Sequence, residues 1–298
     1  MATAWASWPR RGKLSGVFRP RLARALVVIA CLGLAACASS GSEEAVGSSS
    51  STPDLSSADP APALGVVLGG DSVMESLVPA IRSALGGQAQ VDYLAAPTIS
   101  TASDRAAWQA GIQELDPDLV VVLLGSWEVL QPGFAPTEAG WAATYAREVL
   151  DPLAASLTAG GARVLWVEMH TSTKVVTTLS LAVLGAQVRA LTERNDAVEW
   201  IDAGGVVDGP GGVIADVLPG PDGTPQRIRR LDGTGAHLCP AGVARLAGSV
   251  LDWITSRTDE PVTLVTGWEG ARWSRPPDLD HPEQCPPATD PARSTTPP

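Results

Sequence analysis

Three residues have the types and the order that serine-dependent acyl transfer requires. Ser72 follows a short apolar run in "VVLGGDSVMESL" (66–77), at the point where a helical pattern begins. A serine nucleophile needs a base, and His237 in "RRLDGTGAHLCPAG" stands just before the last amphipathic segment. Asp232 lies five residues upstream of His237. Together these residues offer a nucleophile, a base and a carboxylate that orients the base.

The predicted place of Ser72 at a helix start has two interpretations. The first-turn N–H groups and the helix dipole favour negative charge, so the backbone N–H of Ser72 could hold an oxyanion. Asp and Ser are also common helix caps, because their side-chain oxygens accept a hydrogen bond from a free N–H. The residues Asp71 and Ser72 fit both interpretations, and the presence of His237 favours the nucleophile.

Strand and helix patterns alternate around these residues. Apolar runs predict strands at 64–70, 89–96, 117–126, 162–170 and 197–203. A 3.6-residue periodicity predicts helices near 72–85, 101–115, 137–159, 175–194 and 240–257. This alternation predicts an α/β fold, a three-layer α/β/α sandwich around a five-stranded parallel sheet. Ligands of such sheets bind beyond the carboxyl ends of the strands, so we expect the chemistry in the loops there.

The motifs around Ser72 and His237 resemble those of the SGNH (GDSL-type) hydrolase family, over roughly residues 64–257. The resemblance implies a flavodoxin-like sheet and a serine esterase, lipase or carbohydrate O-acyl hydrolase or transferase. It also implies that Ser72 is the nucleophile and His237 the base. The family usually has Asp three residues before the His, where this chain has Thr234. Asp232 then reaches His237 only if the loop bulges; otherwise a backbone carbonyl orients the ring.

The family block after the second strand normally offers a glycine N–H to the oxyanion. Here the strand ends in "LAAPTIS", so the N–H of Ala95 or Ala96 is expected to replace it, since Pro97 has none. We therefore expect an oxyanion hole formed by the backbone N–H groups of Ser72 and of Ala95 or Ala96.

The family block after the third strand normally reads Gly-x-Asn-Asp, and here it reads "GSWE" (125–128). The indole N–H of Trp127 would replace the Asn donor of the oxyanion hole. "GSWE" resembles a variant found in SGNH domains of cell-envelope O-acylation, some fused to membrane acyltransferases. It implies an acylated carbohydrate or small ester as substrate, and a membrane acyltransferase as a candidate partner. Four residues after strands are candidates for substrate contact: Asp71, Ser126, Glu128 and His170.

The altered blocks leave two other functions open. One is a catalytically weak or inactive SGNH-like module that binds glycan or a partner protein through Trp127, Trp268 or Trp273. Trp268 and Trp273, in "TGWEGARW", either cover the cleft or only fasten the C-terminal tail. The other is a structural protein in which Asp71 and Ser72 merely cap a helix.

The first 36 residues have the pattern of an export signal. They contain six basic residues and no acid, followed by an apolar run that ends in "LAAC" (34–37). "LAAC" resembles the bacterial lipobox, so we expect lipidation of Cys37 and anchoring to the outer face of the cell membrane. The alternative is an ordinary signal peptide. The expected organisation is a lipoprotein signal at 1–36, a Ser/Pro-rich tether at 37–62, the SGNH-like domain at 63–260 and a partly disordered tail at 261–298.

Net charge, motif content and cysteine content limit the expected ligands and predict a disulfide. Removal of residues 1–36 leaves 15 basic and 32 acidic residues, a net charge of −17, which would repel nucleic acid. The sequence has no HExxH, GxGxxG or P-loop motif, so no metal or cofactor is expected. Outside the cytoplasm, Cys239 and Cys285 are expected to form a disulfide rather than remain free thiols.

Overall fold

The computed structural model describes residues 64–125, 127–170, 172, 175–275 and 281–288, without the side chains of 175–177. The expected export signal at 1–36, the lipidated Cys37, the tether at 37–62 and the candidate Ser126 lie outside the described residues. No helix among the described residues combines the length and the apolar composition needed to cross a membrane.

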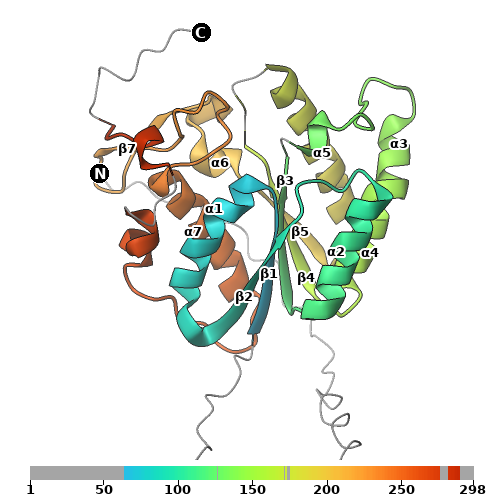
Figure 1. Ribbon diagram of the computed structural model, residues 1–298, viewed down its shortest axis with the longest axis horizontal. Coiled ribbons are helices and arrows are strands. Elements are labelled where there is room, and N and C mark those ends of the chain that lie inside the picture. Colours follow the sequence, from blue (N-terminus) through green and yellow to red (C-terminus); the bar gives the residue numbers. More distant parts are fainter. Residues whose placement is uncertain (1–63, 126, 171, 173–174, 276–280, 289–298) are drawn as a thin grey trace, which may run out of the picture. The chain divides into compact units, whose positions relative to one another are not determined.

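A parallel sheet forms the centre of the described domain (Figure 1). Its five strands are β1 (Leu64–Gly70), β2 (Ala89–Ala95), β3 (Leu119–Leu124), β4 (Arg163–Glu168) and β5 (Val198–Asp202). They lie in the order β2-β1-β3-β4-β5, and all neighbouring pairs are parallel. This is the flavodoxin-like order, so the predicted α/β/α sandwich with five parallel strands is confirmed. The order reverses between β1 and β3, and a ligand crevice is expected at their carboxyl ends.

Helices cover both faces of the sheet (Figure 1). One face carries α1 (Ser72–Leu85) and α7 (Pro240–Ser256), which contact each other; the other carries α2 (Ala102–Leu115), α4 (Asp151–Thr158) and α5 (Val175–Thr192). The helix expected near 137–159 begins as α3 (Trp141–Tyr145) and continues through a π-helical turn, Ala146–Leu150, into α4. Sequence patterns did not predict the short helix α6 (Gly204–Val207) or the hairpin of β6 (Val217–Pro219) and β7 (Pro225–Arg227).

The apolar runs form the core of the domain. Close packing in this core accounts for the two glycines before Asp71. All six residues of β3 are buried, as expected for a central strand covered on both faces. A Cβ at Gly69 would lie 2.3 Å from Cη2 of Trp108, and one at Gly70 would lie 2.1 Å from the carbonyl oxygen of Leu123. Internal packing against α2 and β3 therefore requires these glycines.

Residues 261–275 and 281–288, here called the C-terminal segment, are attached to the domain at two places. Near the end of α1, the N–H of Val265 donates to the carbonyl of Ala84 at 2.8 Å. Near the His237 loop, the N–H of Leu231 donates to the carbonyl of Gln284 at 2.9 Å. A disulfide also joins Cys239 to Cys285, as the cysteine content predicted.

Candidate functional site

Ser72 is the first residue of α1 and lies at the carboxyl edge of the sheet. Asp71 caps the helix, because its Oδ1 accepts a hydrogen bond from the N–H of Val73 at 2.9 Å. Ser72 is exposed, and its N–H donates to no group among the described residues. Asp71 is therefore the cap, which leaves the Ser72 hydroxyl and N–H available to a ligand.

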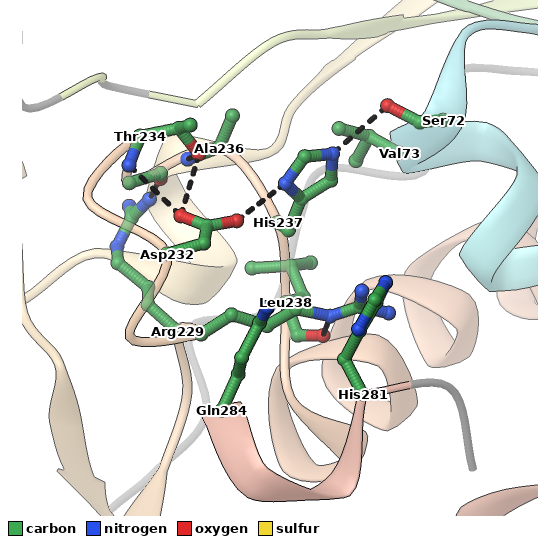
Figure 2. A network of polar contacts seen from close by, with 12 residues as sticks. Ser72, Val73, Arg229, Asp232, Thr234, Ala236, His237, Leu238, His281 and Gln284 are labelled. Atoms are coloured by element: carbon green, nitrogen blue, oxygen red, sulfur yellow. Dashed lines mark hydrogen bonds and ion pairs between the residues drawn. The ribbon is translucent and has the colours of Figure 1, made fainter.

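A chain of short contacts joins Ser72 to His237 and Asp232 (Figure 2). The Oγ of Ser72 lies 2.9 Å from Nε2 of His237, and Nδ1 of His237 lies 2.5 Å from Oδ2 of Asp232. One tautomer satisfies both contacts: Nδ1–H donates to the carboxylate, and Nε2 accepts the Ser72 proton. The structure thus brings the predicted nucleophile, base and orienting acid together.

The loop that carries His237 bulges, and this brings the displaced acid into range. Gly233 and Gly235 have φ of 74° and 68°, a left-handed conformation that glycine adopts without a Cβ clash. Oδ1 of Asp232 accepts hydrogen bonds from both the N–H and the hydroxyl of Thr234, each at 2.8 Å. Partial burial raises the pKa of Asp232, but these bonds and the contact with His237 outweigh it, so the net shift is downward. Asp232 is therefore held as a carboxylate.

Three consecutive backbone carbonyls of this loop, at residues 234–236, accept hydrogen bonds from buried side chains. Ser172 donates to the first at 3.2 Å, Arg229 to the second, and Nε2–H of His170 to the third at 2.8 Å. Arg229 also forms an ion pair with Asp208, and both side chains are almost completely buried. We call Ser172, Arg229 and His170 the carbonyl clamp. Sequence reasoning did not assign this function to any of them.

His170 was predicted to contact substrate, and that prediction is wrong. The side chain is 1% exposed and points to the carbonyl of Ala236 beneath the loop. Burial and the neighbouring charge of Arg229 lower the pKa of His170 to about 3, although the loop carbonyls oppose the shift. His170 is therefore a neutral structural residue at neutral pH.

The substrate-contact prediction for Glu128 is also wrong, because the side chain is fully buried. Its Oε2 accepts the N–H of Ile99 at 2.8 Å, and its Oε1 accepts the hydroxyls of Ser100 at 2.7 Å and Tyr145 at 2.5 Å. Glu128 thus ties the loop after β2 to the loop after β3. Its partners lie 17 to 29 residues away in sequence, so no local pattern indicates this function.

Asp71, a third substrate-contact candidate, faces the interior and is 3% exposed. Its Oδ2 is buried and has no hydrogen-bond partner among the described residues. Burial raises the pKa of Asp71 to about 6, although the N–H groups of Val73 and Met74 and the charge of His237 act in the opposite direction. The prediction that Asp71 contacts substrate is wrong for the same reason as for Glu128.

The predicted oxyanion donors after β2 are not available. The N–H of Ala96 donates to the carbonyl of Gly70 at 3.1 Å. Successive N–H groups of a strand point to opposite sides, so the N–H of Ala95 points away from β1. Trp127 is 54% exposed, and its indole N–H bonds to no described residue. Of the predicted oxyanion donors, only the backbone N–H of Ser72 and the indole N–H of Trp127 remain available.

A cavity of about 540 Å³ opens beside Ser72 and His237. It runs between α1 and the start of α7, and Trp273 and Gln284 of the C-terminal segment form part of its wall. No group of three or more His, Cys, Asp or Glu side chains suited to a metal ion occurs within the described residues.

Comparison with solved structures finds proteins of low sequence identity. The C-terminal catalytic domain of Streptococcus pneumoniae peptidoglycan O-acetyltransferase A, solved with a methylsulfonyl adduct, is 19% identical over 67% of this chain and 97% of that one, with a TM-score of 0.43. A carbohydrate esterase family 3 protein from Talaromyces cellulolyticus is 15% identical over 66% and 99%, with a TM-score of 0.46. A Clostridium thermocellum family 3 carbohydrate esterase is 12% identical over 63% and 94%, with a TM-score of 0.42.

These likenesses establish neither an activity nor a substrate for this chain, and no curated protein matches it. A family model described as "Protein of unknown function (DUF459)" matches residues 65–253. Those residues include β2 to β5, all of β1 except Leu64, Ser72, the His237 loop and most of α7. Because the match spans more than half of the sequence, this protein belongs to the DUF459 family.

Proposed function

We propose that this protein is an exported serine esterase or O-acyltransferase that acts on O-acyl groups of a cell-envelope carbohydrate. The observation that carries the proposal is the chain of contacts from Ser72 Oγ through His237 to Asp232. The exposed Ser72 at the N-terminus of α1 adds a free N–H and a favourable dipole for an oxyanion. The "GSWE" resemblance supports an envelope carbohydrate as the substrate.

The first half of the reaction transfers the acyl group to the protein. Ser72 Oγ attacks the acyl carbon while Nε2 of His237 takes the hydroxyl proton, and Asp232 stabilises the imidazolium. The carbonyl oxygen becomes an oxyanion, held by the N–H of Ser72 and by the indole N–H of Trp127. Collapse breaks the ester bond, and His237 returns the proton to the departing sugar hydroxyl.

The second half regenerates Ser72. A water molecule or another sugar hydroxyl gives its proton to His237 and attacks the acyl carbon of the acyl-enzyme; collapse then breaks the bond between the acyl carbon and Ser72 Oγ, and His237 returns the proton to Ser72. Water as acceptor gives an esterase, and a sugar hydroxyl gives an O-acyltransferase. A membrane acyltransferase is the partner we propose for supplying or receiving acyl groups at the membrane.

The proposed location is the outer face of the cell membrane, with a lipid on Cys37 after removal of residues 1–36. The basic start, the apolar run and "LAAC" support it. Metabolic labelling with an alkyne fatty acid tests this proposal: the wild-type protein should carry the label and Cys37→Ala should not. Equal labelling of the two would contradict the anchor.

Covalent labelling tests the enzymatic proposal. A fluorophosphonate should label the wild-type protein, and p-nitrophenyl acetate should be turned over. Ser72→Ala should lose the labelling, and its turnover should fall by about 10⁴-fold or more. Ser83→Ala, another serine of α1, is the matched control and should retain both properties. Equal turnover by wild type and Ser72→Ala would refute the proposed nucleophile.

The second candidate function is a catalytically weak module that binds glycan or protein at the same cleft. The specific observation in its favour is the bond between the Ala96 N–H and the Gly70 carbonyl, which removes a predicted oxyanion donor. This function predicts no fluorophosphonate labelling, but specific binding of envelope glycan by the wild-type protein.

A further inference from the structure

The two tryptophans of the C-terminal segment have different environments. Trp268 is 6% exposed and packs on α1 and α7, so it fastens the segment to the domain. Trp273 is half-buried and lines the cavity beside Ser72. The two indoles are stacked with ring centroids 6.4 Å apart, and Nε1–H of Trp273 donates to the carbonyl of Trp268 at 2.7 Å. Trp273 is thus held in a defined orientation at the cavity wall.

The cavity combines an apolar surface with several polar groups. Trp273, Pro79 and Val243 supply apolar atoms, and Glu75 and Gln284 supply hydrogen-bonding groups. A long acyl chain matches only the apolar atoms and offers no hydrogen bond to the partly buried Gln284, which costs free energy. A sugar ring matches both kinds of surface, because its C–H face can lie on an indole while its hydroxyls bond to polar side chains.

The second attachment of the segment places its polar side chains at the same site. Gln284 is fixed through its backbone by Leu231, and the adjacent Cys285 is fixed by the disulfide to Cys239. Figure 2 shows Gln284 and His281 projecting from the Pro282–Gln284 turn toward the side of the loop that carries His237. The disulfide therefore links the cavity wall directly to the segment that holds the proposed base.

We infer that the C-terminal segment forms a saccharide subsite next to Ser72, with Trp273 as its stacking surface and Gln284 as a polar contact. The inference rests on the proposed function and adds the part of the protein that recognises the carbohydrate. The subsite holds a sugar ring of the acylated glycan while its ester lies at Ser72.

Kinetics with two substrates test the subsite. The ratio of kcat/KM for O-acetylated chitotetraose to kcat/KM for p-nitrophenyl acetate should fall about tenfold or more in Trp273→Ala, mainly through KM. Trp200→Ala, at a partly exposed tryptophan on β5, is the matched control and should leave the ratio unchanged. An unchanged ratio in Trp273→Ala would overturn the subsite. If Trp273→Ala selectively loses turnover of p-nitrophenyl octanoate, the cavity binds an acyl chain, and the saccharide subsite is overturned as well.

Calorimetry separates this inference from the proposed reaction. O-acetylated chitotetraose should bind to Ser72→Ala without turnover, and adding Trp273→Ala should weaken binding about tenfold or more. Gln284→Ala keeps the backbone bonds of the segment, so it tests the subsite if Trp273→Ala proves unstable; it should weaken binding about threefold or more. Trp273-dependent binding, together with a wild-type protein that neither reacts with the fluorophosphonate nor turns over p-nitrophenyl acetate, would sustain the subsite and refute the reaction. Active protein whose binding is insensitive to both substitutions would refute the subsite alone.

Discussion

The loops on the two sides of Ser72 differ in how their polar groups are used. On the base side, loop 232–237 bends through two left-handed glycines, and its carbonyls at 234–236 are held by the carbonyl clamp. On the oxyanion side, the Ala96 N–H is bonded to the carbonyl of Gly70, and Trp127 is exposed. The base-side loop departs from the SGNH motif that it resembles, yet His237 still contacts both Ser72 and an acid. The oxyanion-side loop lacks the N–H donors that the SGNH motif would supply.

The difference shows which part of the site tolerates a sequence change. A carboxylate can move two residues along a loop when glycines and buried donors fix the new path, because only the final position of its oxygens matters. An oxyanion donor must point to one place, and removing one donor costs about 10²- to 10³-fold in kcat. We therefore expect proton transfer to be well supported in this protein and oxyanion stabilisation to be weak.

Among the variants that keep Ser72, Asp232→Asn should give the largest loss of activity. The amide no longer stabilises the imidazolium and favours the wrong His237 tautomer, so kcat for p-nitrophenyl acetate should fall about 10³- to 10⁴-fold. Asp222→Asn, in the β6–β7 turn, is the control and should keep wild-type kcat. Retention of more than about a tenth of the activity by Asp232→Asn would mean that another group orients His237 and that the base side is not built as described.

Arg229→Met should give the largest loss of stability. It removes the donor to Gly235 and leaves the buried Asp208 without its ion-pair partner, which costs about 3–5 kcal/mol. Urea unfolding measures the change. Arg147→Met removes only an exposed pair with Glu148 and should cost less than about 0.5 kcal/mol. If Arg229→Met matches that control, the clamp does not hold the base side.

The fold could be predicted from the sequence because its strands and helices have distinct apolar periods. The continuous apolar run of β3 and the one-sided pattern of α1 are local signals, and local packing preserves them. The exceptions are short: α6 and the β6–β7 hairpin contain few residues and have no clear periodicity. The π-helical turn before α4 likewise leaves no signal in the apolar pattern.

The site could be predicted only where residue type decides the chemistry. A serine and a histidine at the ends of predicted elements identify Ser72 and His237, and the glycines beside Asp232 permit the bulge. Whether an acid at a strand end points inward depends on distant partners, as Tyr145 shows for Glu128. His170 likewise faces inward to a distant partner, the carbonyl of Ala236, whereas Asp71 is buried because it caps α1 through the neighbouring Val73 N–H.

Asp71→Asn should change how stability depends on pH. The pKa of Asp71 rises from an ordinary value of 3.8 to about 6 in the fold, so between about pH 4 and pH 6 the folded state binds a proton that the unfolded state lacks. Stability therefore falls as pH rises through this window, by about 1–3 kcal/mol, and the loss persists above it. Asn still caps the helix but has no such proton, so this part of the fall should disappear.

Urea unfolding of wild type and Asp71→Asn at pH 4, 5, 6 and 8 measures that difference. Other carboxylates contribute equally to both proteins, so only the difference between the two curves is attributed to Asp71. Parallel curves would show that burial does not raise the pKa of Asp71.

Trp127→Phe should give the smallest effect, and it bears most directly on the weaker side of the site. Phe keeps the aromatic ring but lacks the indole N–H, so it tests that donor alone. Because Trp127 is 54% exposed, water competes for its indole N–H, and we expect kcat to fall about tenfold rather than the 10²- to 10³-fold typical of a buried donor. Trp200→Phe is the matched control and should keep wild-type kcat.

An unchanged kcat in Trp127→Phe would leave the Ser72 N–H as the remaining donor from the predicted set. The contrast between the two sides of Ser72 would then be greater than proposed, because a fully supported base would act with a single backbone donor opposite it.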